Sequence, residues 1–427
     1  MSEIYVGKTP DGFGLVLKNE QRVEHVQIIA STGRGKTQSV ILPWLIQDFV
    51  RGSNVILIDG KGDQGLVTKI RQFAEKPDDV TVFDLGDLRK SAVTNPIKYG
   101  SPQQIADRIF ATFEFESHYF ETVSYEAALL VLELFRSQGR EAKFRDLYRC
   151  LTDDAVLTDL VSSSGKELDA SSSGDDATRL ALKYLAEPFR ARQEKLSGFL
   201  GQLRAFAIGE LAGLVNGDAS GRRSFSLSEL VREPSGDRNR ALVILIPALL
   251  YQKSAARLGQ MFLQEMAWAA ASRKTEEFLP VFLDEFSSFV YEGFLQLLNK
   301  ARSMGIALHL SHQSMGDLEK ISPDFAKAIV TNTNVKCVLG VNDPDTAEFF
   351  AKLFGTEKAK KTTERAEKKF LSEMEMSGFM SVRDVEQYRI HPNRLKTFSR
   401  GQGVLSFMSD GQSIVEEIQF APVPGGL

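Results

Sequence analysis

Cysteine is scarce in this sequence of 427 residues: only Cys150 and Cys337 occur, far apart and without CxxC spacing. That scarcity supports neither a disulfide framework nor a zinc cluster, and it favours a reducing cytosol. Long apolar runs are also lacking, since the strongest one, residues 241–250, is too short to cross a bilayer. The N-terminus does not have the charged-then-apolar layout of a signal peptide. The sequence as given therefore predicts neither a secreted nor a membrane-spanning chain.

The chain also lacks an excess of positive charge. The formal net charge is −4, so the whole molecule does not offer the basic surface that announces a nucleic-acid binder. Any contact with DNA has to be local. With 43% hydrophobic and 25% charged residues, the chain can nevertheless bury a large core, and its length predicts two or three domains.

Apolar runs of strand length alternate with helical patterns over the first hundred residues, as in VQIIA, NVILID and VTVFDL. This rhythm predicts a parallel sheet with helices on both faces. From about residue 101 only helix-period patterns occur, and strand-like runs return with ALVILIPA, FLPVFLDEF, GIALHLSHQ and VKCVLGV. We therefore expect an α/β fold with a parallel-rich central sheet, in which an all-α domain (101–235) is inserted between an N-terminal part (1–100) and a C-terminal part (236–427).

Three segments have simpler expectations. The Ser/Asp/Gly-rich stretch 161–176 predicts a mobile loop. The polar, charged stretch 357–369 predicts a solvated, flexible connector. Near the C-terminus, Asp410 and Gly411 separate two strand-like runs and predict a hairpin turn.

Residues 30–37, ASTGRGKT, fit the phosphate-loop pattern GxxxxGK[ST] except that Ala30 replaces the first glycine. The methyl group is harmless unless the position needs a positive φ. The segment lies between an expected strand and an expected helix, which is the context the pattern requires. Backbone N–H groups would hold the β-phosphate, Lys36 would reach the β- and γ-phosphates, and Thr37 would ligate Mg²⁺. The predicted ATP-binding residues are Thr32, Gly33, Arg34, Gly35, Lys36, Thr37 and Gln38.

An acidic pair closes the apolar run LPVFLDEF and supplies the second half of such a site. Asp284 would hold the Mg²⁺ through water, and Glu285 would position and deprotonate the attacking water. Taken alone, the pair could instead cap a helix N-terminus. Its co-occurrence with the phosphate loop favours the catalytic interpretation.

Two further residues complete a candidate hydrolysis site. Gln313 follows the run GIALHLSH, where a γ-phosphate sensor could lie, and Arg302 ends the helical stretch before it. Such an arginine can act as a finger that reaches a neighbouring subunit's nucleotide. The alternatives are a helix-end charge for Arg302 and a loop contact for Gln313.

Other polar residues are weaker candidates for contacts with nucleotide, metal or DNA. The stretch IDGKGD, with Asp59, Lys61 and Asp63, is either a simple turn or a segment that approaches the nucleotide. His309 and His312 lie three apart on an expected strand, face opposite sides of the sheet, and make a poor metal pair. Candidates for DNA contact are Arg222 and Arg223, although a solvated loop is the simpler interpretation.

The C-terminal part resembles the TraD/TraG-type conjugative coupling proteins, which are P-loop motors related to FtsK and HerA. The resemblance lies in LPVFLDEFSSFV, LLNKARSMGIALHLSHQSMGDL, AIVTNTNVKCVLGVNDPDTAEFFAKLFGT and GQGVLSFMSDGQ, and LIDGKGD resembles the family's DxKGD stretch. It covers about half the chain, including the TraM-recognition region. The resemblance implies a RecA-like P-loop ATPase domain, and it implies that Lys36, Thr37, Asp284, Glu285, Arg302 and Gln313 keep the roles given above.

The resemblance further implies a DNA-translocating ATPase that forms a homo-hexameric ring and drives single-stranded DNA with its relaxase toward a type IV secretion channel. Family members typically begin with transmembrane helices, which this sequence lacks. We therefore expect a cytoplasmic protein at the inner face of the inner membrane, held there by a membrane-anchored partner or by a missing N-terminal anchor. The alternatives are an FtsK/HerA-like pump for chromosome or phage DNA, and a docking receptor for secreted proteins in which nucleotide acts as a switch.

Overall fold

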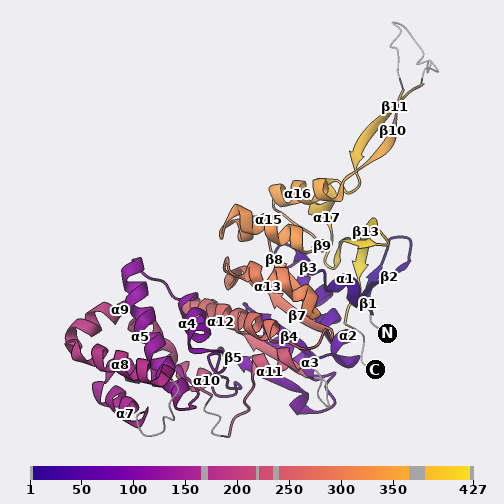
Figure 1. The fold of residues 1–427 in the computed structure, drawn as a ribbon. Coiled ribbons are helices and arrows are strands. Elements are labelled where there is room, and N and C mark those ends of the chain that lie inside the picture. Colours follow the sequence, from indigo (N-terminus) through magenta and orange to yellow (C-terminus); the bar gives the residue numbers. More distant parts are fainter. Residues whose placement is uncertain (1–2, 165–171, 218–220, 234–239, 365–379, 424–427) are drawn as a thin grey trace.

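The computed structural model describes residues 3–164, 172–217, 221–233, 240–364 and 380–423. Within these ranges one eleven-stranded sheet runs through the molecule in the order β2-β1-β13-β12-β9-β3-β8-β7-β4-β6-β5, and helices pack on it (Figure 1). The elements before the long helical segment are β1 (Glu3–Lys8), β2 (Gly14–Lys18), α1 (Asn19–Arg22), β3 (Val26–Ile29), the π-helical turn η1 (Thr37–Ile41), α2 (Leu42–Val50), β4 (Val55–Asp59), α3 (Gln64–Arg71), η2 (Pro77–Asp79) and β5 (Val80–Asp84).

The helical segment follows β5. It comprises α4 (Pro102–Phe110), α5 (His118–Ser137), α6 (Phe144–Thr152), α7 (Asp154–Ser164), α8 (Ser172–Ala186), α9 (Phe189–Ala207), α10 (Ala212–Val215) and α11 (Leu227–Arg232). Although these helices separate β5 from β6 in the chain, the two strands are parallel neighbours in the sheet. Figure 1 shows α5, α7, α8 and α9 gathered to one side of the sheet. This topology agrees with an insertion, while the domain boundaries stay a prediction.

The sheet resumes with the C-terminal elements. They are β6 (Ala241–Leu245), α12 (Gln252–Ala271), β7 (Leu279–Asp284), η3 (Phe286–Ser288), α13 (Phe294–Ala301), η4 (Arg302–Met304), β8 (Ile306–His312), α14 (Met315–Glu319), α15 (Pro323–Asn332), β9 (Val335–Leu339), α16 (Pro344–Phe354), β10 (Thr356–Glu364), β11 (Met380–Tyr388), α17 (Pro392–Thr397), β12 (Gln402–Ser409) and β13 (Gln412–Phe420). Among all described residues, no helix combines the length and the apolarity needed to span a bilayer.

The central strands are parallel and buried on both faces. From β9 through β3, β8, β7, β4 and β6 to β5, every neighbouring pair is parallel. Ile56 and Ile58 of β4 pack into one core with α12 and α13, whereas Val55 and Leu57 pack into a second core with α2. The continuous apolar runs are therefore explained by two-sided burial, and the predicted strands are confirmed.

An antiparallel extension continues the sheet beyond β9. β12 pairs with β9, β13 with β12, β1 with β13 and β2 with β1. The predicted turn at Asp410 and Gly411 is confirmed, since φ is 49° and 76° at these residues and Ser409 pairs with Gln412. The strands β1 and β2 were not predicted: they pair with each other, and only β1 is joined to the rest of the sheet, through the remote strand β13.

A two-stranded hairpin, β10 with β11, projects away from the sheet beside α16 (Figure 1). Its register runs from Thr356 opposite Tyr388 to Glu364 opposite Met380. The predicted flexible connector is therefore wrong for residues 357–364, because backbone hydrogen bonds between two polar strands need no apolar pattern. Residues 365–369 lie outside the described residues. The predicted loop at 161–176 is wrong at its ends, where α7 reaches Ser164 and α8 begins at Ser172; its centre is not described.

Candidate nucleotide site

The phosphate loop joins the carboxyl end of β3 to η1, at the edge of the sheet where β7 and β8 also end. Gly33 and Gly35 have φ of 80° and 96°, a region that glycine enters without steric cost. Ala30 does not have a positive φ. The positive φ angles of the loop thus occur at the two glycines that are present, and Ala30 in place of the first glycine is compatible with the loop conformation.

Lys36 is 6% exposed and points across the loop. Its Nζ donates to the carbonyl oxygen of Ala30 at 3.3 Å and to Oε1 of Glu285 at 3.4 Å. Both distances exceed the 2.7–2.9 Å typical of charge-assisted hydrogen bonds, so the buried ammonium has capacity for a stronger acceptor. A phosphate oxygen fits that requirement.

Asp284 ends β7 and is buried. Its Oδ2 accepts a hydrogen bond from the Thr37 hydroxyl at 2.6 Å, and its Oδ1 accepts one from the Ser311 hydroxyl at 2.7 Å. The carboxylate and the Thr37 hydroxyl together are the oxygen ligands that Mg²⁺ prefers. The sequence did not single out Ser311, because β8 also contains His309 and His312 and no local pattern distinguishes the serine.

Glu285 adopts a left-handed backbone conformation, with φ 50° and ψ 41°. For a residue with a side chain this conformation costs of order 1–3 kcal/mol and is found where surrounding structure imposes it. Its Oε2 accepts a hydrogen bond from Nε2 of Gln313 at 3.1 Å, and Oε1 of Gln313 accepts one from the Thr32 hydroxyl at 2.8 Å. The structure thus connects the phosphate loop, Gln313 and Glu285 in one chain of contacts.

Two predicted nucleotide-binding side chains point elsewhere. Arg34 donates to the carbonyl oxygen of Phe398 at 3.1 Å and to Oδ1 of Asn342 at 3.0 Å. Gln38 accepts a hydrogen bond from Lys69. The structure does not bring either side chain into the cluster around Lys36, so a nucleotide role for these two positions would fall on their backbone N–H groups.

Arg302 lies at the opposite edge of the sheet, just before β8. Its side chain is 61% exposed, and its Nη2 pairs with Oε1 of Glu24 at 2.8 Å. The seven residues of β8 separate it from Gln313, a span of roughly 23 Å at about 3.3 Å per residue. Arg302 therefore cannot reach the phosphate loop of its own chain.

Asp59 lies directly beside Asp284, because the two residues are paired in the register of β4 and β7. Burial, and then the charge of Asp284, raise the pKa of Asp59 to about 6. Its carboxylate accepts hydrogen bonds from the backbone N–H groups of Lys61 at 2.9 Å and Asp63 at 2.7 Å. These bonds form a turn, as one of the two sequence interpretations predicts, and the turn lies against the acidic pair.

The remaining candidates have structural contacts. His309 stacks on Phe282 and contacts Arg22, and His312 lies 3.0 Å from Nε2 of Gln27. Arg222 donates to the carbonyl oxygen of Gly213 at 2.6 Å, which holds its guanidinium within the protein.

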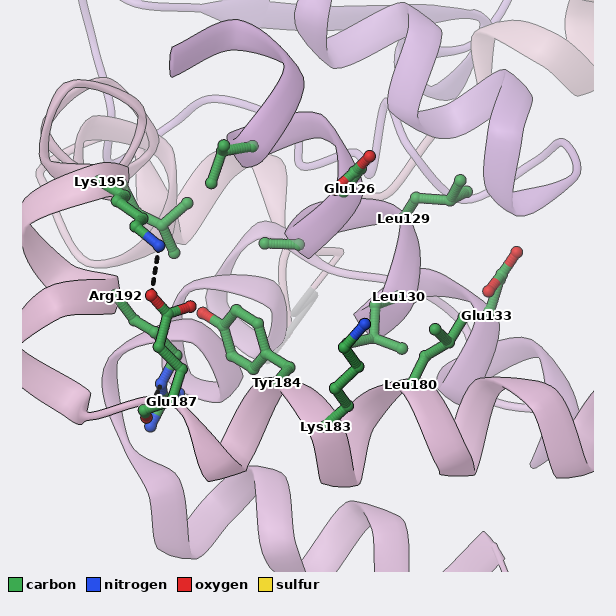
Figure 2. A pocket seen from close by; sticks show the side chains of 13 residues that line it. Glu126, Leu129, Leu130, Glu133, Leu180, Lys183, Tyr184, Glu187, Arg192 and Lys195 are labelled. Carbon is green, nitrogen blue, oxygen red and sulfur yellow. Dashed lines mark hydrogen bonds and ion pairs between the residues drawn. The ribbon is translucent and has the colours of Figure 1, made fainter. Parts of the chain in front are cut away.

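A cavity of about 550 Å³ lies among α5, α8 and α9, remote from the phosphate loop in the sequence (Figure 2). Its walls include the apolar side chain of Leu130 and the ion pair between Lys195 and Glu187, which Figure 2 marks. None of the predicted nucleotide-site residues lines it.

The strand order, the phosphate loop and the acidic end of β7 define the RecA-like P-loop ATPase fold. Residues 2–117 match a family described as "Type IV secretory system Conjugative DNA transfer". Residues 279–400 match one described as "TraM recognition site of TraD and TraG". Together the two matches support a TraD/TraG-type coupling protein.

Individual relatives agree with this assignment. The type 4 coupling protein DotL of Legionella pneumophila is 23% identical over 403 residues, which cover 81% of this chain and 51% of DotL. This chain thus spans about half the length of that relative. The conjugative coupling protein TrwBΔN70 superposes with a TM-score of 0.65 at 16% identity, covering 96% of this chain and 89% of the TrwBΔN70 chain. VirB4 of Thermoanaerobacter pseudethanolicus superposes with a TM-score of 0.58 at 16% identity, covering 98% and 97% of the two chains.

Proposed function

We propose that this chain is the ATP-hydrolysing motor of a coupling protein that delivers DNA to a type IV secretion channel. The observation that carries the proposal is the convergence of Lys36, Thr37, Asp284, Glu285 and Gln313 at one edge of the parallel sheet. A scaffold or a pure nucleotide switch does not need the arrangement of Glu285 and Gln313.

The residues fit ATP with Mg²⁺, and TrwB has been described in complex with ADP and Mg²⁺. Bound Mg²⁺ would neutralise charge that develops on the phosphates. Lys36 would bind the β- and γ-phosphates, while Thr37 and Asp284 would hold the metal. Glu285 would accept the proton of the attacking water, and Gln313, which already contacts Oε2 of Glu285, would orient that water.

The placement of Arg302 supports a ring. Because this guanidinium is separated from its own phosphate loop by the length of β8, it can act on a nucleotide only in a neighbouring copy. A homo-hexamer in which each copy completes the next site agrees with that geometry. DNA passing through the ring would need only a few local cations per subunit, which the net charge of −4 permits.

The cargo and partners follow from the family. The matches to a conjugative DNA transfer family and to a TraM recognition site support single-stranded DNA, a relaxase and secretion components as partners. A chromosome or phage DNA pump remains the alternative, and a relaxase encoded beside this chain would favour coupling.

The test is steady-state ATP turnover of the purified full chain, measured with and without single-stranded DNA. We expect Mg²⁺-dependent turnover that rises when DNA is added, and rings around the strand in electron micrographs. Lys36→Ala serves as the matched inactive control. Nucleotide binding without any turnover, with or without DNA, would instead support a docking receptor switched by nucleotide.

A further inference from the structure

Gly60 follows β4, and a side chain at this position would have to displace the Ser288 hydroxyl. A Cβ atom built at this position would lie 2.1 Å from Oγ of Ser288 and 3.1 Å from the carbonyl oxygen of Glu285. Gly60 does not have a positive φ, so a left-handed backbone is not what favours glycine here. A side chain at Gly60 would instead move the Ser288 hydroxyl away from the carbonyl oxygen of Glu285 and so loosen the turn that carries Glu285.

The turn around Glu285 is held by short contacts on the same side. The Ser288 hydroxyl donates to the carbonyl oxygen of Glu285 at 2.8 Å, and the Ser288 N–H donates to the same oxygen at 2.9 Å. The N–H of Gly60 donates to the carbonyl oxygen of Asp284 at 3.1 Å. The β4–α3 turn thus lies against Asp284, which precedes the left-handed residue Glu285, and against Ser288, which follows it.

The β4–α3 turn cannot easily yield, because it is fixed from its other side. The carboxylate of Asp59 accepts two backbone N–H groups of the turn. The carbonyl oxygen of Gly60 accepts the N–H of Ala248 at 3.1 Å, and that of Asp59 accepts the N–H of Ile246 at 2.9 Å. The segment that follows β6 therefore holds the turn at Gly60 in place.

We propose that the turn at Gly60 is a positioning device for the catalytic base: it holds Glu285 in its left-handed conformation and so directs the carboxylate toward Gln313 and Lys36. Gly60 and Ser288 are positioning residues, since neither reaches the cluster around Lys36. The inference rests on the proposed function, in which Glu285 activates water. It predicts that crowding at Gly60 impairs the chemical step and leaves nucleotide binding intact.

The experiment is a double-mutant cycle on the full chain, read as kcat and KM for ATP, with nucleotide affinity and thermal midpoint measured beside them. Gly60→Ala should lower kcat two- to fivefold with KM and affinity within twofold, because its methyl group displaces the Ser288 hydroxyl from the carbonyl oxygen of Glu285. Ser288→Ala should lower kcat by a similar factor, because it removes the same hydrogen bond. The double variant should stay at the level of Ser288→Ala alone, since that bond can be lost only once. Gly198→Ala in α9, where a Cβ meets no atom within 4 Å, is the matched control and should keep wild-type kinetics.

Three results would overturn the inference. These are an unchanged kcat in Gly60→Ala, multiplicative losses in the double variant, and a parallel loss of kcat and nucleotide affinity. If Gly60→Ala does not fold, an unchanged kcat in Ser288→Ala decides against the proposal. If the wild-type chain hydrolyses ATP no faster than Lys36→Ala, the proposed function itself is refuted. That result is distinct from the three above, which refute only the inference about Gly60.

Discussion

Replacing Arg302 by alanine distinguishes two roles for this residue, an arginine finger that acts on a neighbouring subunit's nucleotide and a charge at a helix end. In the structure the guanidinium is 61% exposed and pairs with Glu24 at 2.8 Å. An exposed pair of this kind contributes about 1 kcal/mol or less to stability. A finger contributes roughly 10³-fold to turnover, which corresponds to ~4 kcal/mol of transition-state stabilisation. We therefore expect Arg302→Ala to fold and bind ATP nearly normally while turning over about a thousandfold more slowly.

The matched control is Glu24→Ala, which breaks the same ion pair but keeps the guanidinium. It should retain turnover within about twofold, since the stability term alone is small. Turnover of the wild type should rise more steeply than linearly with protein concentration, and DNA should lower the concentration needed. Mixing Arg302→Ala with Lys36→Ala subunits should restore part of the activity, because each variant supplies the half-site that the other lacks.

Equal losses of activity in Arg302→Ala and Glu24→Ala would show that the ion pair matters and not a finger. Turnover per subunit that is insensitive to concentration, with no recovery in the mixed variants, would also contradict a finger. Either result would exclude catalysis between subunits through this residue.

Further outcomes follow from the same geometry. Lys36→Ala should abolish nucleotide binding in a fluorescence titration, because it removes the buried cation of the phosphate loop; unchanged affinity would discard the site. Glu285→Gln should bind ATP but hydrolyse it slowly in single-turnover assays, and near-normal rates would place the base elsewhere. Burial lowers the pKa of His25 to about 4, with Nε2 facing the carbonyl oxygen of Leu298 and Nδ1 accepting the N–H of Leu308. Because the unfolded chain protonates this imidazole first, near pH 6.5, the contribution of His25 to the free energy of unfolding should fall as pH drops from 6.5 toward 4. His25→Asn should remove that contribution from the pH dependence measured in urea titrations; an unaltered pH dependence would contradict the assignment.

Much of the fold could be predicted because the central strands are buried on both faces and so read as continuous apolar runs. The residues around Lys36 and Asp284 could also be predicted from local patterns, since phosphate binding requires glycines and a lysine at a set spacing. The roles of Ser311 and Gly60 could not be predicted from the sequence. Ser311 acts through a contact with Asp284 of β7, and Gly60 acts through contacts with the turn that follows β7. The strand β10 escaped prediction because its pairing with β11 depends on the backbone.

By itself the sequence determined the parallel sheet, the phosphate loop and the acidic end of β7, since each is encoded in a short, local pattern. Tertiary structure alone decided how these segments converge: the order of the strands places β8 between β3 and β7, so that Gln313 meets both Thr32 and Glu285. It also decided that the exposed guanidinium of Arg302 pairs with Glu24, because that contact joins segments far apart in the sequence. Local patterns specify which side chains are present, whereas distances between segments hundreds of residues apart depend on how the whole chain packs.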